Sequence, residues 1–225
     1  MNGKVIVVTG AAGALGGVLA ARLAAQGARV VGLDLAAFRS EANFELALGG
    51  IDLGAPDPIE RAFAAIGERF GTLDGVANIA GGFAWEKIAG GSAATWERMF
   101  RTNVLSCLLV SQRSLALLRR PGGAIVNVSA AASQRGDTGM GAYTAAKAGV
   151  SRLTESLAAE CKDAGVRVNA VMPSIIDTAA NRRDMPDADF SRWVAPDALA
   201  DAIAFLLSDA ARAITGALLP VTGRV

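Results

Sequence analysis

The sequence predicts a single α/β domain over residues 1–225, built on a doubly wound parallel sheet of the Rossmann type. Short apolar runs rich in valine recur along the chain, and longer segments with apolar residues at helical spacing separate them. Strands that are apolar on both faces are typical of a parallel sheet covered by helices on either side. The hydrophobic content of 52% supports one substantial core, and no linker or low-complexity tract divides the chain.

The first part of the chain follows the order strand, turn, helix, strand. A strand is expected at 4–9 and a helix at 18–26, joined by the glycine-rich segment 10–17. The second strand is expected at 28–33 and the third at 44–51. Because a parallel crossover usually needs a dozen or more residues, the short connection between these two strands is predicted to lack a helix.

Strands and helices continue to alternate in the rest of the chain. Further strands are expected at 73–78, 124–128 and 166–171, and further helices at 58–70, 94–118, 142–164 and 196–208. The two longest helices carry more apolar positions than one buried stripe requires, which indicates a partner helix. These positions include Leu105, Leu108, Leu109, Leu153 and Leu157.

Composition and charge exclude several classes of function. The formal charge is +1 with no run of like charges, so neither nucleic acid nor a membrane surface is an expected partner. The chain has no histidine, which excludes a histidine-based triad and zinc sites that need imidazole, and no metal is expected. Cys107 and Cys161 are isolated and are expected to be small buried hydrophobic residues in a reducing compartment. We therefore expect a soluble, cytoplasmic protein that acts on a small molecule.

A glycine-rich turn follows the first predicted strand and opens the first helix. Gly10, Gly13 and Gly16 allow a tight turn, a close approach of a pyrophosphate to the backbone, and close packing of helix on strand. Asp34 ends the second strand about twenty residues later, where a carboxylate binds the adenosine ribose hydroxyls and repels a 2′-phosphate. The expected cofactor is therefore NAD(H). NADP is less favoured, although Arg39 lies near enough in sequence to weaken the preference.

Tyr143 and Lys147 lie one helical turn apart at the start of an expected helix. Tyr143 is the only tyrosine of the chain, and the spacing places both side chains on one helical face. A neighbouring ammonium favours the phenolate and lowers the pKa of the phenol, so the pair is predicted to exchange a proton near neutral pH. The motif alone leaves one alternative open, a buried tyrosine beside a solvated lysine.

These motifs occur in a characteristic order along the chain. The order is Gly10-Gly13-Gly16, Asp34, Asp52-Leu53, Asn78 to Gly81, Asn103, Tyr143-x-x-x-Lys147 and Pro173. With this order over nearly its whole length, the chain resembles the short-chain dehydrogenases/reductases. The resemblance implies Tyr143, Lys147 and Asn103 as catalytic residues, with Asn103 holding a water that passes protons from Lys147 to solvent. It also implies a cofactor site made of Gly10, Gly13, Leu15, Gly16, Asp34, Asp52, Leu53, Asn78, Ala80, Gly81, Tyr143, Lys147, Pro173, Ile176 and Thr178.

One position departs from the pattern of this family. The catalytic serine of typical members is replaced by Ala130, and in a regular strand the preceding Ser129 points to the opposite face. Within the family the chain looks similar to the quinonoid dihydropteridine reductases, which share the alanine, the missing helix after the second strand and a segment like 176–193. By contrast, Asn103 is typical of the ordinary carbonyl-reducing members.

Three functions are consistent with these residues. The first is NADH-dependent reduction of a quinonoid dihydropterin or a similar flat ring, the second is NAD-dependent oxidation or reduction of an alcohol/ketone pair, and the third is NAD binding without turnover. Trp85, Phe190 and Trp193 are expected to contact the substrate, with core packing an equal alternative for the last two. The resemblance further implies that the two long helices pair across a two-fold axis, in a homodimer or homotetramer.

Overall fold

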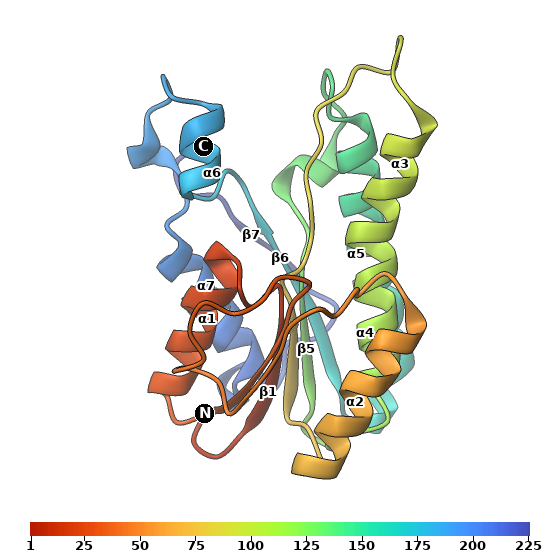
Figure 1. Cartoon of the computed structure of the whole chain (residues 1–225), viewed down its shortest axis with the longest axis vertical. Coiled ribbons are helices and arrows are strands. Elements are labelled where there is room, and N and C mark those ends of the chain that lie inside the picture. Colours follow the sequence, from red (N-terminus) through yellow and green to blue (C-terminus); the bar gives the residue numbers. More distant parts are fainter.

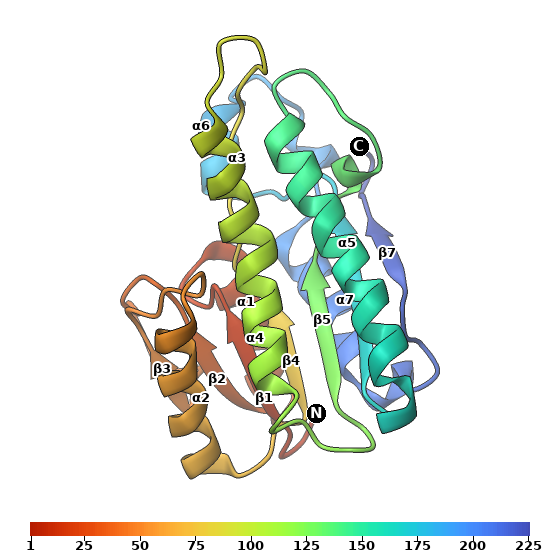
Figure 2. The same ribbon diagram turned by 90° about the vertical axis from the view of Figure 1, so that its right-hand side faces the viewer.

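Seven parallel strands form one sheet in the order β3-β2-β1-β4-β5-β6-β7 (Figures 1 and 2). The structure is a computed structural model and describes residues 1–225. The strands are β1 (Val5–Thr9), β2 (Arg29–Leu33), β3 (Leu46–Leu48), β4 (Gly75–Asn78), β5 (Ala124–Val128), β6 (Arg167–Pro173) and β7 (Leu218–Val221). Strand β1 pairs with β2 on one side and β4 on the other, so the loops that follow β1 and β4 diverge. Open α/β sheets bind ligands at such a point.

Helices cover both faces of this sheet, which confirms the doubly wound α/β fold. Helices α1 (Ala14–Ala25) and α7 (Pro196–Leu207) cover one face, and α2 (Pro56–Phe70), α4 (Ser106–Ser114) and α5 (Gly141–Cys161) cover the other (Figures 1 and 2). Each face has its own apolar core. Both cores draw on alternate residues of the central strand β1, because successive side chains of a strand point to opposite faces.

The connection between β2 and β3 contains no helix, as predicted. Two phenylalanines of this connection take the place of a helix on the sheet. Phe38 and Phe44 pack edge to face with ring centroids 5.0 Å apart. They lie on Gly32 of β2, where a Cβ atom would stand 2.8 Å from the ring of Phe44 and 2.9 Å from that of Phe38. The rings therefore occupy the space that a side chain at this position would fill.

The helix predicted at 94–118 is divided in the structure. Helix α3 (Ala93–Met99) passes into a π-helical segment at Phe100–Leu105, from which α4 continues to Ser114. A π-helical turn holds an extra residue and is frequent at functional sites. Hydrophobic spacing alone does not distinguish such a turn from an α-helical one, so the sequence predicted one continuous helix.

Strand β7 and the short helix α6 (Ala179–Asp184) are absent from the sequence-based prediction. Strand β7 lies at the edge of the sheet and contains Pro220, a residue that argues against a strand assignment except at an edge. Helix α6 lies beyond the carboxyl ends of the strands, as does α3 (Figure 1). No helix of the chain is both long enough and apolar enough to cross a membrane.

Candidate active site

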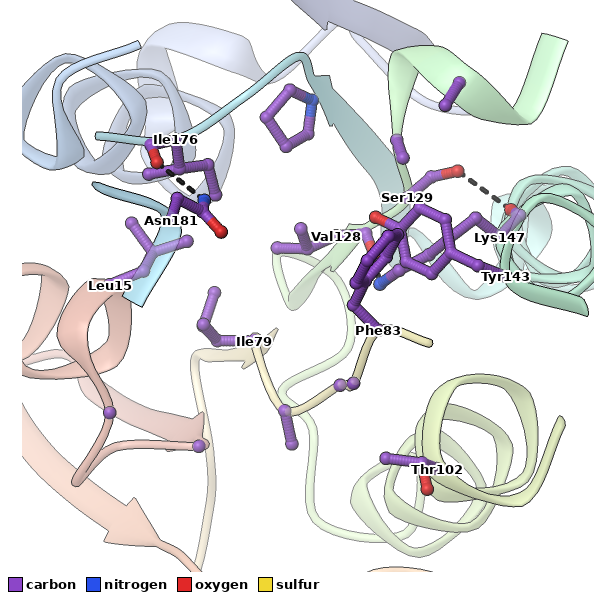
Figure 3. Close-up of a pocket in the computed structure, with 18 of the residues that line it drawn as sticks. Leu15, Ile79, Phe83, Thr102, Val128, Ser129, Tyr143, Lys147, Ile176 and Asn181 are labelled. Atoms are coloured by element: carbon purple, nitrogen blue, oxygen red, sulfur yellow. Dashed lines mark hydrogen bonds between the residues drawn. The ribbon is translucent and has the colours of Figure 1, made fainter. Parts of the chain in front are cut away.

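A cavity of about 1450 Å³ opens at the carboxyl ends of the central strands. It runs from the glycine-rich turn after β1 to the start of α5 and brings together residues that are far apart in sequence (Figure 3). The predicted site residues on its wall are Gly10, Gly13, Leu15, Gly16, Asp34, Asp52, Leu53, Ala80, Gly81, Trp85, Tyr143, Lys147, Pro173 and Ile176.

The glycine-rich turn has the shape of a phosphate cradle. Gly10 has a φ of 64°, and a Cβ atom there would lie 2.9 Å from the backbone of Ala80. A Cβ atom on Gly16 would collide with the carbonyl oxygen of Gly10. Helix α1 has no side-chain cap at Gly13 and no acidic residue in its first turn, so its leading N–H groups can bind an anion. These features fit the pyrophosphate of a dinucleotide.

Asp34 lies beside this turn at the end of β2. One carboxylate oxygen accepts a hydrogen bond from the Ala12 N–H at 2.9 Å, and the other accepts one from the Ala36 N–H at 2.8 Å. The side chain therefore has a fixed orientation at the cavity wall and ties the strand to the glycine-rich turn. Its negative charge lies where the ribose of an adenosine would be read.

Tyr143 and Lys147 project from the first turns of α5 into the opposite end of the cavity (Figure 3). Lys147 is only 5% exposed, and its Nζ donates a hydrogen bond to the Val128 carbonyl at 2.8 Å. The Tyr143 ring packs edge to face with Phe83, with centroids 5.0 Å apart. Phe83 is not among the residues that the sequence predicts for the site, although it directly follows the glycine pair after β4.

Burial shifts the pKa values of the two residues in opposite directions. It raises the pKa of the Tyr143 phenol to about 12 and lowers the pKa of the Lys147 ammonium to about 8. The prediction that Lys147 lowers the pKa of the phenol is therefore wrong for this structure, because desolvation dominates at Tyr143. At neutral pH the phenol holds its proton, and Lys147 titrates close enough to neutrality to exchange one.

No serine replaces the missing hydroxyl at Ala130. Ala130 lies on the cavity wall and contributes only a methyl group. The Ser129 hydroxyl points to α5, where it donates to the Lys147 carbonyl at 2.8 Å (Figure 3). It also shares a hydrogen bond with Ser151 at 2.7 Å. The alternation of side chains along β5 predicted this orientation.

Two predicted asparagines lie behind the cavity wall rather than on it. Asn103, 1% exposed, donates to the carbonyls of Gly82 and Met99 at 3.1 and 3.0 Å and accepts from the Gly82 N–H at 3.2 Å. A Cβ atom on Gly81 would stand 2.7 Å from Asn103 Oδ1 and 3.2 Å from Lys147 Nζ, so a glycine at this position lets both groups approach. Asn78 is also buried and does not reach the cavity. Its Nδ2 donates to the side chains of Ser111 and Asn127, which joins β4 to α4 and β5.

Three residues of the segment after β6 that were predicted to contact the cofactor or the substrate lie away from the cavity. The Thr178 hydroxyl caps α6 by accepting from the Asn181 N–H at 3.2 Å. Phe190 and Trp193 pack on each other with centroids 4.8 Å apart, and Trp193 is 8% exposed. None of the three lines the cavity, since the segment turns their side chains into its own packing. Trp193 is therefore a core residue, which was the alternative prediction for it. Asn181 of the same segment lines the cavity instead.

Trp85 lines the cavity but also has a second contact. Its ring covers Gly139, where an added Cβ atom would collide with it, and the neighbouring Glu86 N–H donates to the Gly139 carbonyl at 2.8 Å. Gly139 has a φ of 72° and lies just before α5. Trp85 therefore holds the loop after β4 against the loop that leads to Tyr143.

The chain is similar to known proteins over nearly its whole length. A family model described as enoyl-(acyl carrier protein) reductase matches residues 10–223. The chain is 32% identical to 2-(S)-hydroxypropyl-CoM dehydrogenase 3 of Xanthobacter autotrophicus, over 99% of this chain and 96% of that protein. It is 36% identical to cis-4-hydroxycyclohexanecarboxylate dehydrogenase of Sinomonas cyclohexanicum, over 98% and 95% respectively. The solved structure of levodione reductase matches with a TM-score of 0.92 at 27% identity, over 99% of this chain and 97% of that one.

The relatives are named for oxidation and reduction, and they align with this chain over nearly their whole length. The matches establish the family, whereas the closer similarity to dihydropteridine reductases stays a prediction. With its glycine-rich turn, its carboxylate after β2 and its tyrosine–lysine pair on one cavity, this chain belongs to the short-chain dehydrogenase/reductase family and is an oxidoreductase that uses a nicotinamide cofactor.

Proposed function

We propose that the protein transfers a hydride between NAD(H) and a flat, conjugated ring substrate, with Tyr143 as the sole side-chain proton donor. The observation that carries this proposal is Ala130, which contributes only a methyl group to the wall at the position of the family's serine, while the Ser129 hydroxyl is bonded to the Lys147 carbonyl. For a simple ketone, a missing donor to the developing oxyanion costs about 2.7 to 4 kcal/mol. A quinonoid ring of the dihydropterin type spreads the arriving charge over conjugated nitrogens, so one donor suffices.

The chain's own residues have distinct tasks in this reaction. The glycine-rich turn and Asp34 bind the phosphates and the adenosine ribose of the cofactor, which supplies the hydride when bound. The Tyr143 hydroxyl gives its proton to the substrate. Lys147, whose pKa is lowered by burial to about 8, returns a proton to the resulting phenolate. Asn103 lies close behind Gly81 and positions the backbone next to Lys147.

The apolar wall near Tyr143 supports a ring-shaped substrate. Phe83 and Trp85 are 58% and 57% exposed although both are large and apolar, and both line the cavity. Phe83 contacts the ring of the proton donor itself. Aromatic side chains bind flat rings through offset and edge-to-face packing, so these two residues suit such a substrate.

A second candidate is an NAD(H)-dependent oxidoreductase for a cyclic secondary alcohol and its ketone. The names of the relatives favour it, since one acts on a hydroxycyclohexanecarboxylate and a similar structure on levodione. To separate the two candidates, NADH oxidation by the purified protein would be followed with quinonoid dihydropterin and with a panel of cyclic ketones. Faster turnover of the pterin would support the first proposal, and turnover of ketones alone would replace it with the second. Binding of NADH without any turnover would instead point to a sensor.

Restoring the missing hydroxyl tests the role of Ala130 directly. Ala130→Ser is expected to raise kcat on cyclic ketones by about 100-fold or more, because it adds one donor to the developing oxyanion. Turnover of a quinonoid ring should change by less than about threefold, since that charge is already delocalised. Ala132→Ser adds a hydroxyl elsewhere on the same wall and is the matched control. Equal gains on both substrates, or no gain on ketones, would contradict the argument.

The preference for NADH over NADPH is proposed to rest on the charge of Asp34. Asp34→Asn is expected to reduce the ratio of NADH affinity to NADPH affinity by about tenfold or more, because it removes the repulsion between the carboxylate and a 2′-phosphate. The asparagine still accepts a hydrogen bond, so the glycine-rich turn should be largely preserved. Calorimetric dissociation constants for both cofactors measure the ratio, with Glu41→Gln as a control for the loss of charge nearby. An unchanged ratio would mean that other residues read the ribose.

A further inference from the structure

Helix α5, which carries Tyr143, has no side-chain cap at its N-terminus. Its N-cap residue is Met140, and its first turn holds no acidic residue. Gly139 precedes Met140 and Gly141 follows it, so neither neighbour has a side chain that could pack. The start of α5 therefore has few contacts of its own and depends on packing against other elements.

The loop after β4 supplies the first of these contacts. The Trp85 ring lies directly over Gly139, and the Glu86 N–H donates to the carbonyl of this glycine at 2.8 Å. The Glu86 carboxylate in turn accepts from the Ser92 N–H at 3.1 Å, and the Ser92 hydroxyl caps α3. The loop thus joins the segment that leads into α5 to the start of α3.

Helix α3 supplies the second contact. It lies beside the start of α5 (Figure 2), and a Cβ atom on Gly141 would stand 3.2 Å from Trp96 Cζ2 and 3.7 Å from Ile88 Cδ1. Gly141 does not have a positive φ, so a glycine here gives space to the ring and is not needed for the backbone conformation. Trp96 is 41% exposed and does not line the cavity. It contacts α5 two residues before Tyr143 without reaching the substrate.

We propose that Trp85 and Trp96 form a clasp on the two glycines that lead into α5, and that this clasp holds Tyr143 in place at the cavity wall. Phe83, from the same loop, packs on the Tyr143 ring itself. Aromatic side chains from 83–96 therefore follow α5 from the residues before its first turn to the phenol. Trp96 is a positioning residue that acts through Gly141. The effect on turnover rests on the proposed role of Tyr143 as proton donor, whereas the effect on the placement of the phenol does not.

The environment of the phenol can be measured directly. Tyr143 is the only tyrosine of the chain, so the phenolate absorbance of the protein reports this residue alone. Burial is the cause of its raised pKa of about 12. The elements around the phenol carry the charged residues Glu86, Lys87, Glu97, Arg98, Arg101, Asp137 and Lys147. None of them contributes to the shift, so the pKa of the phenol measures how well the ring is shielded from water.

Trp96→Ala is expected to move the phenol pKa part of the way from about 12 toward its ordinary value of 10.0, because a loosened clasp admits water to the ring. Near-ultraviolet absorbance from about pH 8 to about pH 11 measures the phenolate, the range between the ordinary and the raised value. Far-ultraviolet circular dichroism on the same samples shows that the chain stays folded. Lys147, with a pKa of about 8, is neutral over most of this range and does not stabilise the phenolate.

Trp96→Ala should also lower kcat by about tenfold and leave KM unchanged. A displacement of a catalytic group by about 1 Å can cost about 100-fold in rate, whereas Trp96 does not line the cavity. Trp96→Phe keeps a ring against Gly141 and should restore most of the loss. Phe205→Ala removes an aromatic side chain of similar exposure, 44%, from α7 on the other face of the sheet and is the matched control.

Gly141→Ala reaches the same contact from the other side. Its added methyl group would push the Trp96 ring by a few tenths of an ångström, so it should change the phenol pKa and kcat in the same direction but less. In the Trp96→Ala background it should have no further effect, since both changes act on one contact.

Three results would overturn the clasp. They are an unchanged phenol pKa in Trp96→Ala, a loss confined to KM, and equal effects of Phe205→Ala. If the wild-type protein turns over no substrate, the proposed function is wrong. The titration needs neither cofactor nor substrate, so it still decides whether the clasp holds Tyr143.

Discussion

Tyr143→Phe is expected to lower kcat for hydride transfer by about 100- to 10,000-fold, the range for loss of a positioned acid. The change removes one oxygen and keeps the ring, so the packing of Phe83 on this residue should be retained. Binding of NADH should therefore weaken by no more than about tenfold, the factor that corresponds to the loss of one hydrogen bond at most. Stopped-flow single-turnover kinetics separate the hydride-transfer step from binding.

The matched control for this experiment is Phe83→Leu. It removes the ring that packs on Tyr143 and leaves the phenol in place, so it should have a much smaller effect on the chemical step than loss of the hydroxyl. A Tyr143→Phe variant that keeps more than a tenth of the wild-type rate would mean that the proton comes from water or from another group, since the smallest effect expected for a general acid is about 100-fold.

Lys147→Met is expected to change how the free energy of unfolding depends on pH. Burial lowers the pKa of Lys147 from 10.5 to about 8, so between these values the unfolded chain binds more protons than the folded one. This residue therefore contributes stability that increases as pH rises from about 8 to 10.5, and the variant lacks that increase. The difference in the free energy of unfolding between the wild type and the variant should change by about 3 kcal/mol between pH 8 and pH 10.5.

In the wild type and in Lys147→Met alike, two other groups make the free energy of unfolding fall, rather than rise, at alkaline pH. Burial raises the pKa of Cys107 and that of Tyr143 to about 12, so each lowers the stability of the fold at alkaline pH. Comparing the two curves cancels the contribution of Tyr143, whereas the pKa of Cys107 rises further in the variant, because the Lys147 charge that lowers it is gone. Urea unfolding at pH 7, 8, 9 and 10 measures the difference, with the exposed Lys162→Met as a control. Parallel curves for the wild type and Lys147→Met would show that the ammonium is not desolvated.

The parts of the site that depend on local backbone were predictable from the sequence. Gly10 and Asp34 have the expected places because strand, turn and helix follow one another directly, and the same local order put Tyr143 and Lys147 on one helical face. The alternation along β5 also predicted that Ser129 would not substitute at position 130.

Features that depend on tertiary packing were not predictable in the same way. Phe190 and Trp193 are aromatic residues of the kind that line substrate pockets, but they pack within their own segment and do not line the cavity. The pKa of Tyr143 depends on how deeply the phenol is buried, which spacing along a helix cannot show.

Two aromatic side chains, Phe38 and Phe44, are enough to cover strand β2 at Gly32, where a doubly wound fold usually has a helix. A crossover helix normally hides the face of its strand from water, and here a pair of aromatic rings covers the same strand. Strand β2 keeps its register with β1 without that helix, and so Asp34 keeps its place. Insertions or deletions between β2 and β3 should therefore be tolerated in evolution and in engineering, provided that two rings or their equivalent in volume remain over the glycine.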